Sequence, residues 1–291
     1  MIVIICNPAA KKASEKKLEN ACRYLRDRGH EVESFLTRQR GEAELLARDL
    51  LKKNPSLVLA AGGDGTFNEV MNGLAGSVIP MAILPLGTTN VLAKELGVPE
   101  HAEHAVDFAL SRYPHTIALG RITLTHSSPP VSRYFCLMAG IGFDGAVVHG
   151  VNETLKKFSG KGAYIFSGFK TLFMLKLSGL QLTIDGKMRS CFSVLIGNVA
   201  KYGGNFSVTP DADIADPALS VCFFQGKRRA DVVRYVLGIL WGRHLQFHDV
   251  SHTKATALEV RGSAHIQIDG DYLGMTPATI EIVPNILRLV Y

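Results

Sequence analysis

The sequence lacks several features that would assign it to a class at once. Its five cysteines are scattered and odd in number, and none forms a C-x-x-C pair, which argues against a disulfide framework and a zinc ribbon. It has no internal repeat, no low-complexity segment and no apolar run long enough to span a bilayer. The opening "MIVIICNPAA" has no basic stretch, so it predicts a β-strand rather than a signal peptide. We therefore expect a cytoplasmic protein.

The composition is that of an ordinary globular protein with a mild basic excess. The chain has 291 residues, of which 47% are hydrophobic and 20% charged, enough for one large domain or two modest ones. Its net charge of +6 suits anionic partners such as nucleotides, nucleic acid or anionic lipid headgroups. A plain solvated basic surface explains the same charge equally well.

The two parts of the chain carry different patterns. Residues 1–120 alternate helical segments with continuous apolar strands such as "IVIIC" and "LVLAA", a pattern typical of a parallel α/β sheet. Residues 121–291 contain segments of alternating polarity and a tight Asp185-Gly186 turn, which predict an antiparallel sandwich or barrel.

Two helical stretches interrupt the second part. One covers roughly 153–177, inside a segment that interleaves aromatic residues with lysines, among them Lys156, Lys157 and Lys161. This segment fits a lipid gate with a basic rim, and it fits equally well a helix packed on the sandwich. The other stretch, 228–242, places six apolar residues on one helical face: Val232, Val233, Val236, Leu237, Leu240 and Trp241.

The most informative segment is "LAAGGDGTFNEVMNG", residues 59–73, where a buried strand meets a helix. Ligands of open parallel sheets bind beyond the carboxyl ends of the strands. Glycines there let the backbone approach a phosphate group, and the helix N-terminus favours an anion. Asp64 fits beside phosphate if a Mg²⁺ ion or a substrate hydroxyl group lies between them. The turn matches neither a Walker A loop nor G-x-G-x-x-G, and an unremarkable glycine turn is the alternative.

"GGDGT" resembles the signature of diacylglycerol kinase catalytic domains, sphingosine and ceramide kinases and NAD kinases. "PLGTTNVLAKELG" (85–97) narrows the resemblance to the diacylglycerol kinase-like lipid kinases. Three further segments are similar to motifs of that family in the same order: "NPAA" (7–10), "AGIGFDGAVV" (139–148) and "IDGDYLG" (268–274).

This resemblance implies an ATP-binding α/β domain of Rossmann or phosphofructokinase type in residues 1–120. It also implies a β-sandwich domain for the lipid substrate in residues 121–291, with the active site between the two. The residues that it implies for ATP binding are Asn7, Thr37, Gly62, Gly63, Asp64, Gly65, Thr66, Phe67, Asn68 and Thr88. Thr37 fits a helix or turn cap equally well. Asn90 fits three roles: ordering its loop, binding nucleotide or capping the next helix.

Two aspartates compete for the role of proton acceptor. The resemblance favours Asp271 as acceptor and Asp64 as the residue that organises Mg²⁺ and phosphates, although "DGDYLG" also fits a plain hairpin turn. A structural Mg²⁺ site is implied for the segment "TPDADIADPALSV", with Asp216 as ligand by its side chain and Asp213 and Ala218 by their backbone. Pro217 and Ser220 depart from the family pattern there, so a plain acidic loop is the alternative.

Together these motifs predict an ATP- and Mg²⁺-dependent kinase that phosphorylates a lipid hydroxyl group, most simply that of diacylglycerol. Its expected partners are ATP, the lipid alcohol and, transiently, an anionic membrane surface, and we expect no nucleic-acid partner. The alternatives are an NAD kinase-like enzyme, disfavoured because its N-x-G-x-L-G-F stretch is missing, and a catalytically silent lipid-binding module. The choice of lipid acceptor and the oligomeric state, including a homodimer, stay open.

Overall fold

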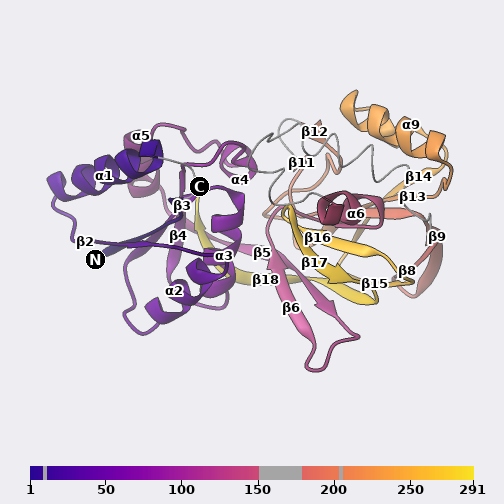
Figure 1. Cartoon of the computed structure of the whole chain (residues 1–291), viewed down its shortest axis with the longest axis horizontal. Coiled ribbons are helices and arrows are strands. Elements are labelled where there is room, and N and C mark those ends of the chain that lie inside the picture. Colours follow the sequence, from indigo (N-terminus) through magenta and orange to yellow (C-terminus); the bar gives the residue numbers. More distant parts are fainter. Residues whose placement is uncertain (9–11, 151–178, 203–205) are drawn as a thin grey trace. The chain divides into compact units, whose positions relative to one another are not determined.

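The computed structural model describes residues 1–8, 12–150, 179–202 and 206–291. The chain forms two compact units, one of Met1–Leu119 with Val283–Tyr291 and the other of Gly120–Ile282 (Figure 1). Most of the predicted lysine- and aromatic-rich segment, including the helix over 153–177, lies outside the described residues. Within the described ranges, no helix is both long and apolar enough to cross a bilayer.

The first unit alternates strands and helices, as the sequence pattern predicts. Its elements are β1 (Ile2–Cys6), α1 (Lys12–Asp27), β2 (Val32–Leu36), α2 (Glu42–Leu50), β3 (Leu57–Gly62), α3 (Asp64–Leu74), β4 (Pro80–Pro85), α4 (Val91–Glu95) and α5 (Ala102–Ser111). The strands pair in parallel in the order β2-β1-β3-β4. β1 and β3 are buried throughout because they lie inside the sheet with both faces covered.

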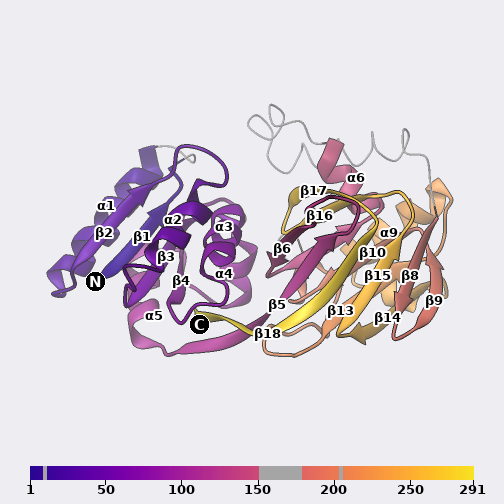
Figure 2. The ribbon, with the colours of Figure 1, turned by 90° about the horizontal axis from the view of Figure 1, so that it is seen from below.

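The strand order reverses between β1 and β3. The chain first moves from β1 to β2 on one side, then returns past β1 to β3 on the other. Right-handed crossovers therefore place α1 on one face of the sheet, where it packs beside α5, and α2 on the opposite face beside α3 (Figure 2). The carboxyl ends of β1 and β3 flank this reversal, the usual ligand position in such sheets.

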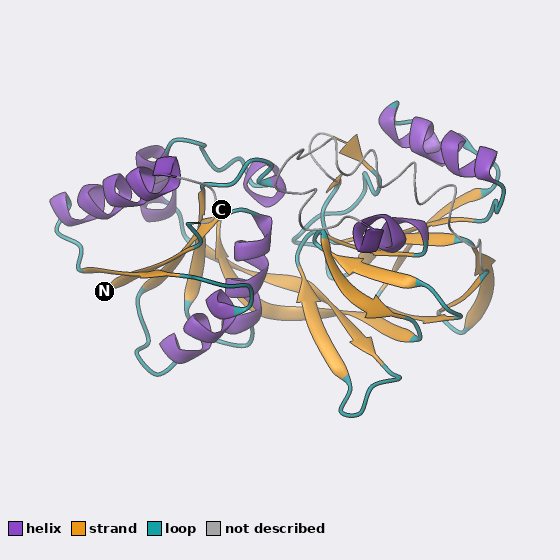
Figure 3. Cartoon of the chain, in the orientation of Figure 1, coloured by secondary structure: helices purple, strands orange, loops and turns teal. Residues whose placement is uncertain are grey.

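The second unit is built mainly of antiparallel strands (Figure 3). Its elements are β5 (Pro114–Leu124), β6 (Val131–Phe135), β7 (Met138–Ile141), α6 (Phe143–Gly150), β8 (Leu180–Ile184), β9 (Lys187–Cys191), β10 (Ser193–Gly197), β11 (Lys201–Tyr202), β12 (Phe206–Ser207), β13 (Leu219–Phe224), α9 (Arg229–Leu240), a 3₁₀ turn (His244–Gln246), β14 (Val250–Ala255), β15 (Ala257–Arg261), β16 (His265–Ile268), β17 (Asp271–Met275) and β18 (Ala278–Val290).

Two sheets of this unit share one apolar core. The strands β18-β15-β8-β9 belong to one sheet, and β14-β13-β10-β7-β16-β17 form the other. Fully buried side chains from both sheets meet in a single cluster, including Leu182, Val260 and Ile280 from the first and Ile141, Val194 and Val221 from the second. The alternating burial of β8 follows its alternating sequence, and Asp185 and Gly186 turn the chain with positive φ angles of 50° and 74°. The predicted α/β unit and antiparallel sandwich are both confirmed.

The strand β18 contributes to both units. Its first part pairs antiparallel with β15, whereas Arg288 and Leu289 pair in parallel with Pro80 and Met81 of β4. The sequence places one boundary near residue 120, but Val283–Tyr291 return to the first unit. A single strand of 13 residues is long enough to pair with a strand of each unit, so alternation along the sequence carries no sign of this division.

Candidate functional site

Two glycine-containing loops of the first unit are joined backbone to backbone. The N–H groups of Leu86 and Gly87, just after β4, both donate to the carbonyl oxygen of Gly62, at 2.8 and 2.9 Å. A Cβ atom on Gly87 would lie only 2.7 Å from the Cα atom of Gly63, so a larger residue would separate the two loops. The "GGDGT" and "PLGTTN" segments, which the resemblance treats as separate motifs, therefore form one structural feature.

The carboxylate of Asp64 connects the same two loops. Asp64 is the first residue of α3, and its two oxygens accept the N–H groups of Val91 and Leu92, at 3.0 and 3.1 Å. Those N–H groups belong to the first turn of α4, whose own N-cap residue, Asn90, makes no side-chain cap bond. Burial raises the pKa of the Asp64 carboxyl group, and the two N–H donors offset part of that rise. Asp64 is thus an N-terminal cap supplied from another helix.

Asn90 leaves one polar atom unpaired beside the glycine contact. Its backbone is left-handed, with φ of 46°, and its amide nitrogen donates to the carbonyl oxygen of Gly87 at 2.8 Å. Its side chain is buried, and among the described residues its Oδ1 atom accepts no hydrogen bond. Buried acceptors are nearly always paired in folded proteins, so a ligand group or water is expected there. Of the three roles open for Asn90, ordering its own loop is the one the contacts show.

Asn7 and Thr37 lie at the same edge of the sheet. Asn7 follows β1 and donates its N–H group to the carbonyl oxygen of Ala61 at 3.0 Å. Thr37 follows β2, and its N–H group donates to the carbonyl oxygen of Cys6 at 2.8 Å. The Thr37 side chain is buried, with its hydroxyl group 3.4 Å from the same carbonyl oxygen.

The other residues implied for ATP binding differ in exposure. Gly65 and Thr88 are exposed. Thr66 is buried, and its hydroxyl group occupies the space that a Cβ atom on Gly62 would need. Phe67 is fully buried in the core, and the buried Asn68 accepts a hydrogen bond from Asn72 at 3.1 Å. The side chains of Phe67 and Asn68 therefore support α3 from within the unit.

In the second unit, "IDGDYLG" forms the β16–β17 hairpin. Asp269 and Gly270 occupy the turn with φ angles of 48° and 85°, and Asp271 is the first residue of β17, opposite Ile268. This is a two-residue primed turn, as the hairpin alternative predicts. The side chain of Asp271 is half-exposed.

Asp269 is a structural residue that the sequence analysis missed. Its carboxylate accepts the N–H groups of Cys136, Leu137 and Met138, each at 2.9 Å, and its own N–H group donates to Met138. All three donors belong to buried residues. The motif places two acidic residues around one glycine, and the sequence gives no sign that the first of them accepts three backbone N–H groups.

A second set of contacts holds the turn from the other side. The Gln267 side chain accepts the N–H group of Gly270 at 2.8 Å and donates to Asp144 at 2.6 Å. The Tyr202 hydroxyl group donates to the other oxygen of Asp144 in a very short hydrogen bond. Burial raises the pKa of the Asp144 carboxyl group, and these two donors partly counteract it. Asp144 belongs to the "GFDG" segment, and the sequence alone does not indicate that it contacts Gln267 and Tyr202.

The loop implied as a metal site has other partners. Asp216 accepts the N–H group of Ala218 at 3.1 Å, and its second oxygen forms an ion pair with Lys254 of β14. Asp213 accepts the N–H group of Ala215 at 2.9 Å, and its carbonyl oxygen accepts the N–H group of Asp216 at 2.9 Å. Both oxygens of the implied carboxylate ligand are therefore engaged, one of them by a cationic side chain.

These residues, as arranged, do not fit a divalent cation. The ammonium group of Lys254 already supplies positive charge to Asp216. Ser220, which stands where the family has an aspartate, contacts His252 at 3.3 Å. The structure thus favours a plain acidic loop at residues 213–218, and we assign no reaction step to a metal ion there.

Family models match almost the whole chain. Residues 1–122 match the model described as "Diacylglycerol kinase catalytic domain". Residues 138–291 match the model described as "YegS C-terminal NAD kinase beta sandwich-like domain". The two matches correspond to the α/β part and the sandwich part of the fold.

Individual relatives agree with these matches. A "Diacylglycerol kinase" of Mycobacterium tuberculosis is 28% identical over 295 residues, covering 99% of this chain and 94% of that protein. One of Bacillus subtilis is 29% identical over 284 residues, covering 94% of this chain and 90% of that protein. A crystal structure of a Bacillus anthracis diacylglycerol kinase aligns with a TM-score of 0.69 at 20% identity, covering 100% and 96% of the two chains. Yeast NADH kinase aligns with a TM-score of 0.55 at 12% identity, covering 100% and 83%. The structural likenesses show the fold.

We predict that Asp269→Ala destabilises the second unit far more than Asp185→Ala does. Both aspartates occupy left-handed positions in Asp-Gly turns, so the backbone cost of alanine cancels between them. Only Asp269 leaves three buried N–H groups without an acceptor, at about 1–3 kcal/mol for each unsatisfied group. Denaturant unfolding of the two variants measures the difference. Equal losses of stability in the two variants would show that the three hydrogen bonds accepted by Asp269 contribute little.

We also predict that the nucleotide-free protein is insensitive to divalent cations. Treatment with EDTA should shift the melting temperature by less than about 1 °C, below the roughly 2–4 °C expected for 1 kcal/mol. Lys254→Met should create a stabilising response to Mg²⁺ by releasing one oxygen of Asp216, whereas Lys187→Met, an exposed control, should not. A fall in the wild-type melting temperature on chelation would contradict this interpretation.

Proposed function

Because this chain belongs to the family that joins a diacylglycerol kinase catalytic domain to a YegS-type C-terminal domain, we propose that it is an ATP-dependent lipid kinase. The reaction is transfer of the γ-phosphoryl group of ATP to a lipid hydroxyl group, most simply that of diacylglycerol, giving a phosphatidic acid for phospholipid synthesis. The observation that carries the proposal is the joined pair of glycine loops at the carboxyl edge of the parallel sheet.

ATP binds the first unit in this proposal. The first N–H groups of α3 have no acceptor within the helix, and they favour an anion together with the helix dipole. Gly63 and Gly65 provide a backbone without side chains at this point, and Gly65 is exposed. Asn7, Thr37 and Thr88 border the site, and the unpaired Oδ1 atom of Asn90 offers an acceptor to a nucleotide hydroxyl or amino group.

Asp64 fits a Mg²⁺ ion that accompanies the ATP phosphates. A carboxylate has about four acceptor positions, and the N–H groups of Val91 and Leu92 use two of them. Mg²⁺ is commonly bound by one or two carboxylates together with phosphate oxygens and water. When bound, the ion neutralises charge on the transferring group. The chain's own contribution is to hold Asp64 in a fixed orientation against α4.

Asp271 accepts the proton in this proposal. The lipid hydroxyl oxygen forms a bond to the γ-phosphorus, the bond from that phosphorus to the bridging oxygen breaks with its electrons leaving on ADP, and the hydroxyl proton passes to the Asp271 carboxylate. Asp64 is less suited to this step because its two oxygens already accept backbone N–H groups. The half-exposed Asp271 starts a strand whose turn is held by Asp269 and Gln267, which suits a positioned base.

Residues 121–291 supply the lipid side of the reaction in this proposal, and the enzyme is a cytoplasmic protein that visits an anionic membrane surface for its substrate. The nearest enzymatic alternative is phosphorylation of NAD, since the second family model is named for an NAD kinase-like sandwich. ATP consumption measured with detergent-dispersed diacylglycerol, other lipid alcohols and NAD in parallel separates the two. If ATP is not consumed with any of these acceptors, the alternative of a catalytically silent lipid-binding module would be favoured.

We predict that Asp64→Asn reduces lipid phosphorylation at least about a hundredfold, the scale of one lost electrostatic contributor. Asparagine keeps the size of the side chain but removes its charge and turns an N–H₂ group toward α4. The matched control is Glu69→Gln, because Glu69 lies on the same helix and its oxygens accept the N–H groups of Gly41 and Ala43. Both variants should melt somewhat lower than wild type, and only Asp64→Asn should lose turnover. A similar kinase activity in the two variants would contradict the role of Asp64.

We predict that Asp271→Asn abolishes lipid phosphorylation and leaves ATP affinity unchanged. Asparagine cannot take the hydroxyl proton, whereas the proposed ATP site uses residues of the other unit. Nucleotide affinity by calorimetry and turnover by phosphate transfer are the two measurements. If ATP affinity falls together with turnover, Asp271 acts in nucleotide binding or in the fold, and Asp64 becomes the better base.

A further inference from the structure

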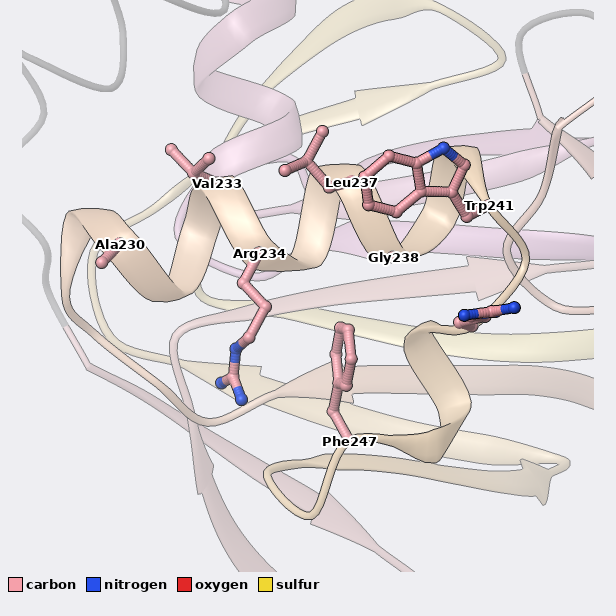
Figure 4. Close-up of a pocket in the computed structure, with 8 residues that line it drawn as sticks. Ala230, Val233, Arg234, Leu237, Gly238, Trp241 and Phe247 are labelled. Carbon is pink, nitrogen blue, oxygen red and sulfur yellow. The ribbon is translucent and has the colours of Figure 1, made fainter.

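Helix α9 of the second unit presents an apolar stripe to solvent. The five residues of the stripe follow helical spacing, with exposed fractions of 42% for Val233, 42% for Val236, 38% for Leu237, 46% for Leu240 and 70% for Trp241. The sequence predicts that these residues share one face with Val232, and such a face normally packs on a core. Val232 instead is buried, and the other five are exposed. Figure 4 shows Val233, Leu237 and Trp241 along one side of the helix, with Arg234 and Phe247 on the other. A pocket of about 400 Å³ lies among these residues.

The opposite face of α9 is firmly attached to its own unit. Val232 is buried in a small cluster with Phe192. The hydroxyl group of the buried Tyr235 accepts the N–H group of Gly226 at 2.7 Å and donates to Asp249. A Cβ atom on Gly238 would lie 2.5 Å from the ring of Phe247. The helix therefore cannot turn its apolar stripe inward without breaking these contacts.

The exposed charges around the stripe are basic. The exposed basic residues are Lys227 and Arg228 just before the helix, Arg229 at its first position and Arg243 after its end. The exposed residues over 225–248 include no Asp or Glu. The two nearby acidic residues, Asp231 and Asp249, are half-buried, and both pair with Arg234.

We propose that α9 is a docking helix for an anionic lipid bilayer, with its apolar stripe in the headgroup region and the basic residues at both ends against the lipid phosphates. Tryptophan beside a basic rim is typical of helices that lie in a membrane interface. A second copy of the chain is a poorer occupant because it would oppose one basic rim with another. The proposal deepens the proposed function, since a lipid kinase must reach substrate in a bilayer, but its test needs no catalysis.

The test uses Trp241, which is the chain's single tryptophan. In the absence of ATP, anionic phosphatidylglycerol vesicles should shift its fluorescence to the blue, and brominated acyl chains should quench it. Neutral phosphatidylcholine vesicles should do so far less. Binding to the anionic vesicles should weaken between about 0.05 and 0.5 M salt, because the attraction acts within a Debye length.

Two variants separate the apolar and the electrostatic contributions. Leu237→Gln with Leu240→Gln removes two exposed leucines and keeps the tryptophan probe, and Lys227→Glu with Arg243→Glu reverses two basic residues. Each should weaken vesicle binding about tenfold or more. The matched control, Lys187→Glu with Met188→Gln, changes the same kinds of exposed residue on β9 and should bind like wild type.

Two results would overturn the proposal. One is co-sedimentation with anionic vesicles without any change in Trp241 emission, since another surface would then carry the binding. The other is a blue shift that grows with protein concentration and needs no vesicles, since a second copy would then cover the stripe. Kinase activity on detergent-dispersed diacylglycerol should be unaffected in all three variants. If wild type itself lacks that activity, the proposed function fails, while the vesicle data still decide the role of α9.

Discussion

The carboxylate of Asp64 and the N–H groups of Val91 and Leu92 form the contact on which the first unit's candidate site depends. This contact fixes the start of α4 against the start of α3, and the Gly63–Gly87 approach allows the two loops to come close enough for it. Without it, the loop after β4 would keep its backbone hydrogen bonds to Gly62, but the first N–H groups of α4 would lose their acceptor. The acidic residue among three glycines therefore has a structural role, because it accepts the first N–H groups of α4. A role in binding Mg²⁺ would be additional to this structural role.

The second unit uses the same physical device at its own turn. Asp269 binds three backbone N–H groups, and its neighbour two positions later, Asp271, remains half-exposed. In both motifs an acidic side chain that resembles a catalytic group satisfies buried backbone donors, whose exposure to an apolar interior would be costly. Because such motif residues hold the fold, a loss of activity on their substitution has to be separated from a loss of structure.

Much of the fold could be predicted from the sequence because it depends on periodicity. Continuous apolar strands indicated the parallel sheet, and Leu180, Leu182 and Ile184 indicated one face of the sandwich. Contacts between distant segments could not be predicted in this way. Nothing in the pattern shows that Lys254 pairs with Asp216, that Asp269 binds residues 136–138, or that the apolar face of α9 points to solvent. These features depend on which partner each side chain meets, and a single sequence does not contain that information.

The return of β18 to the first unit has a consequence for how the protein is made. Leu287, Leu289 and Val290 are buried in the first unit, where β18 pairs with β4, and the strands β1 to β4 end at residue 85. On the ribosome, β1 to β4 emerge long before this strand, which follows all of the second unit. Until β18 has been synthesised, the edge of the sheet next to β4 is therefore unpaired. An unpaired strand edge can form hydrogen bonds with other chains. The folding of the first unit can finish only after the sandwich has been synthesised, so early termination of translation would damage the α/β unit as well as the sandwich.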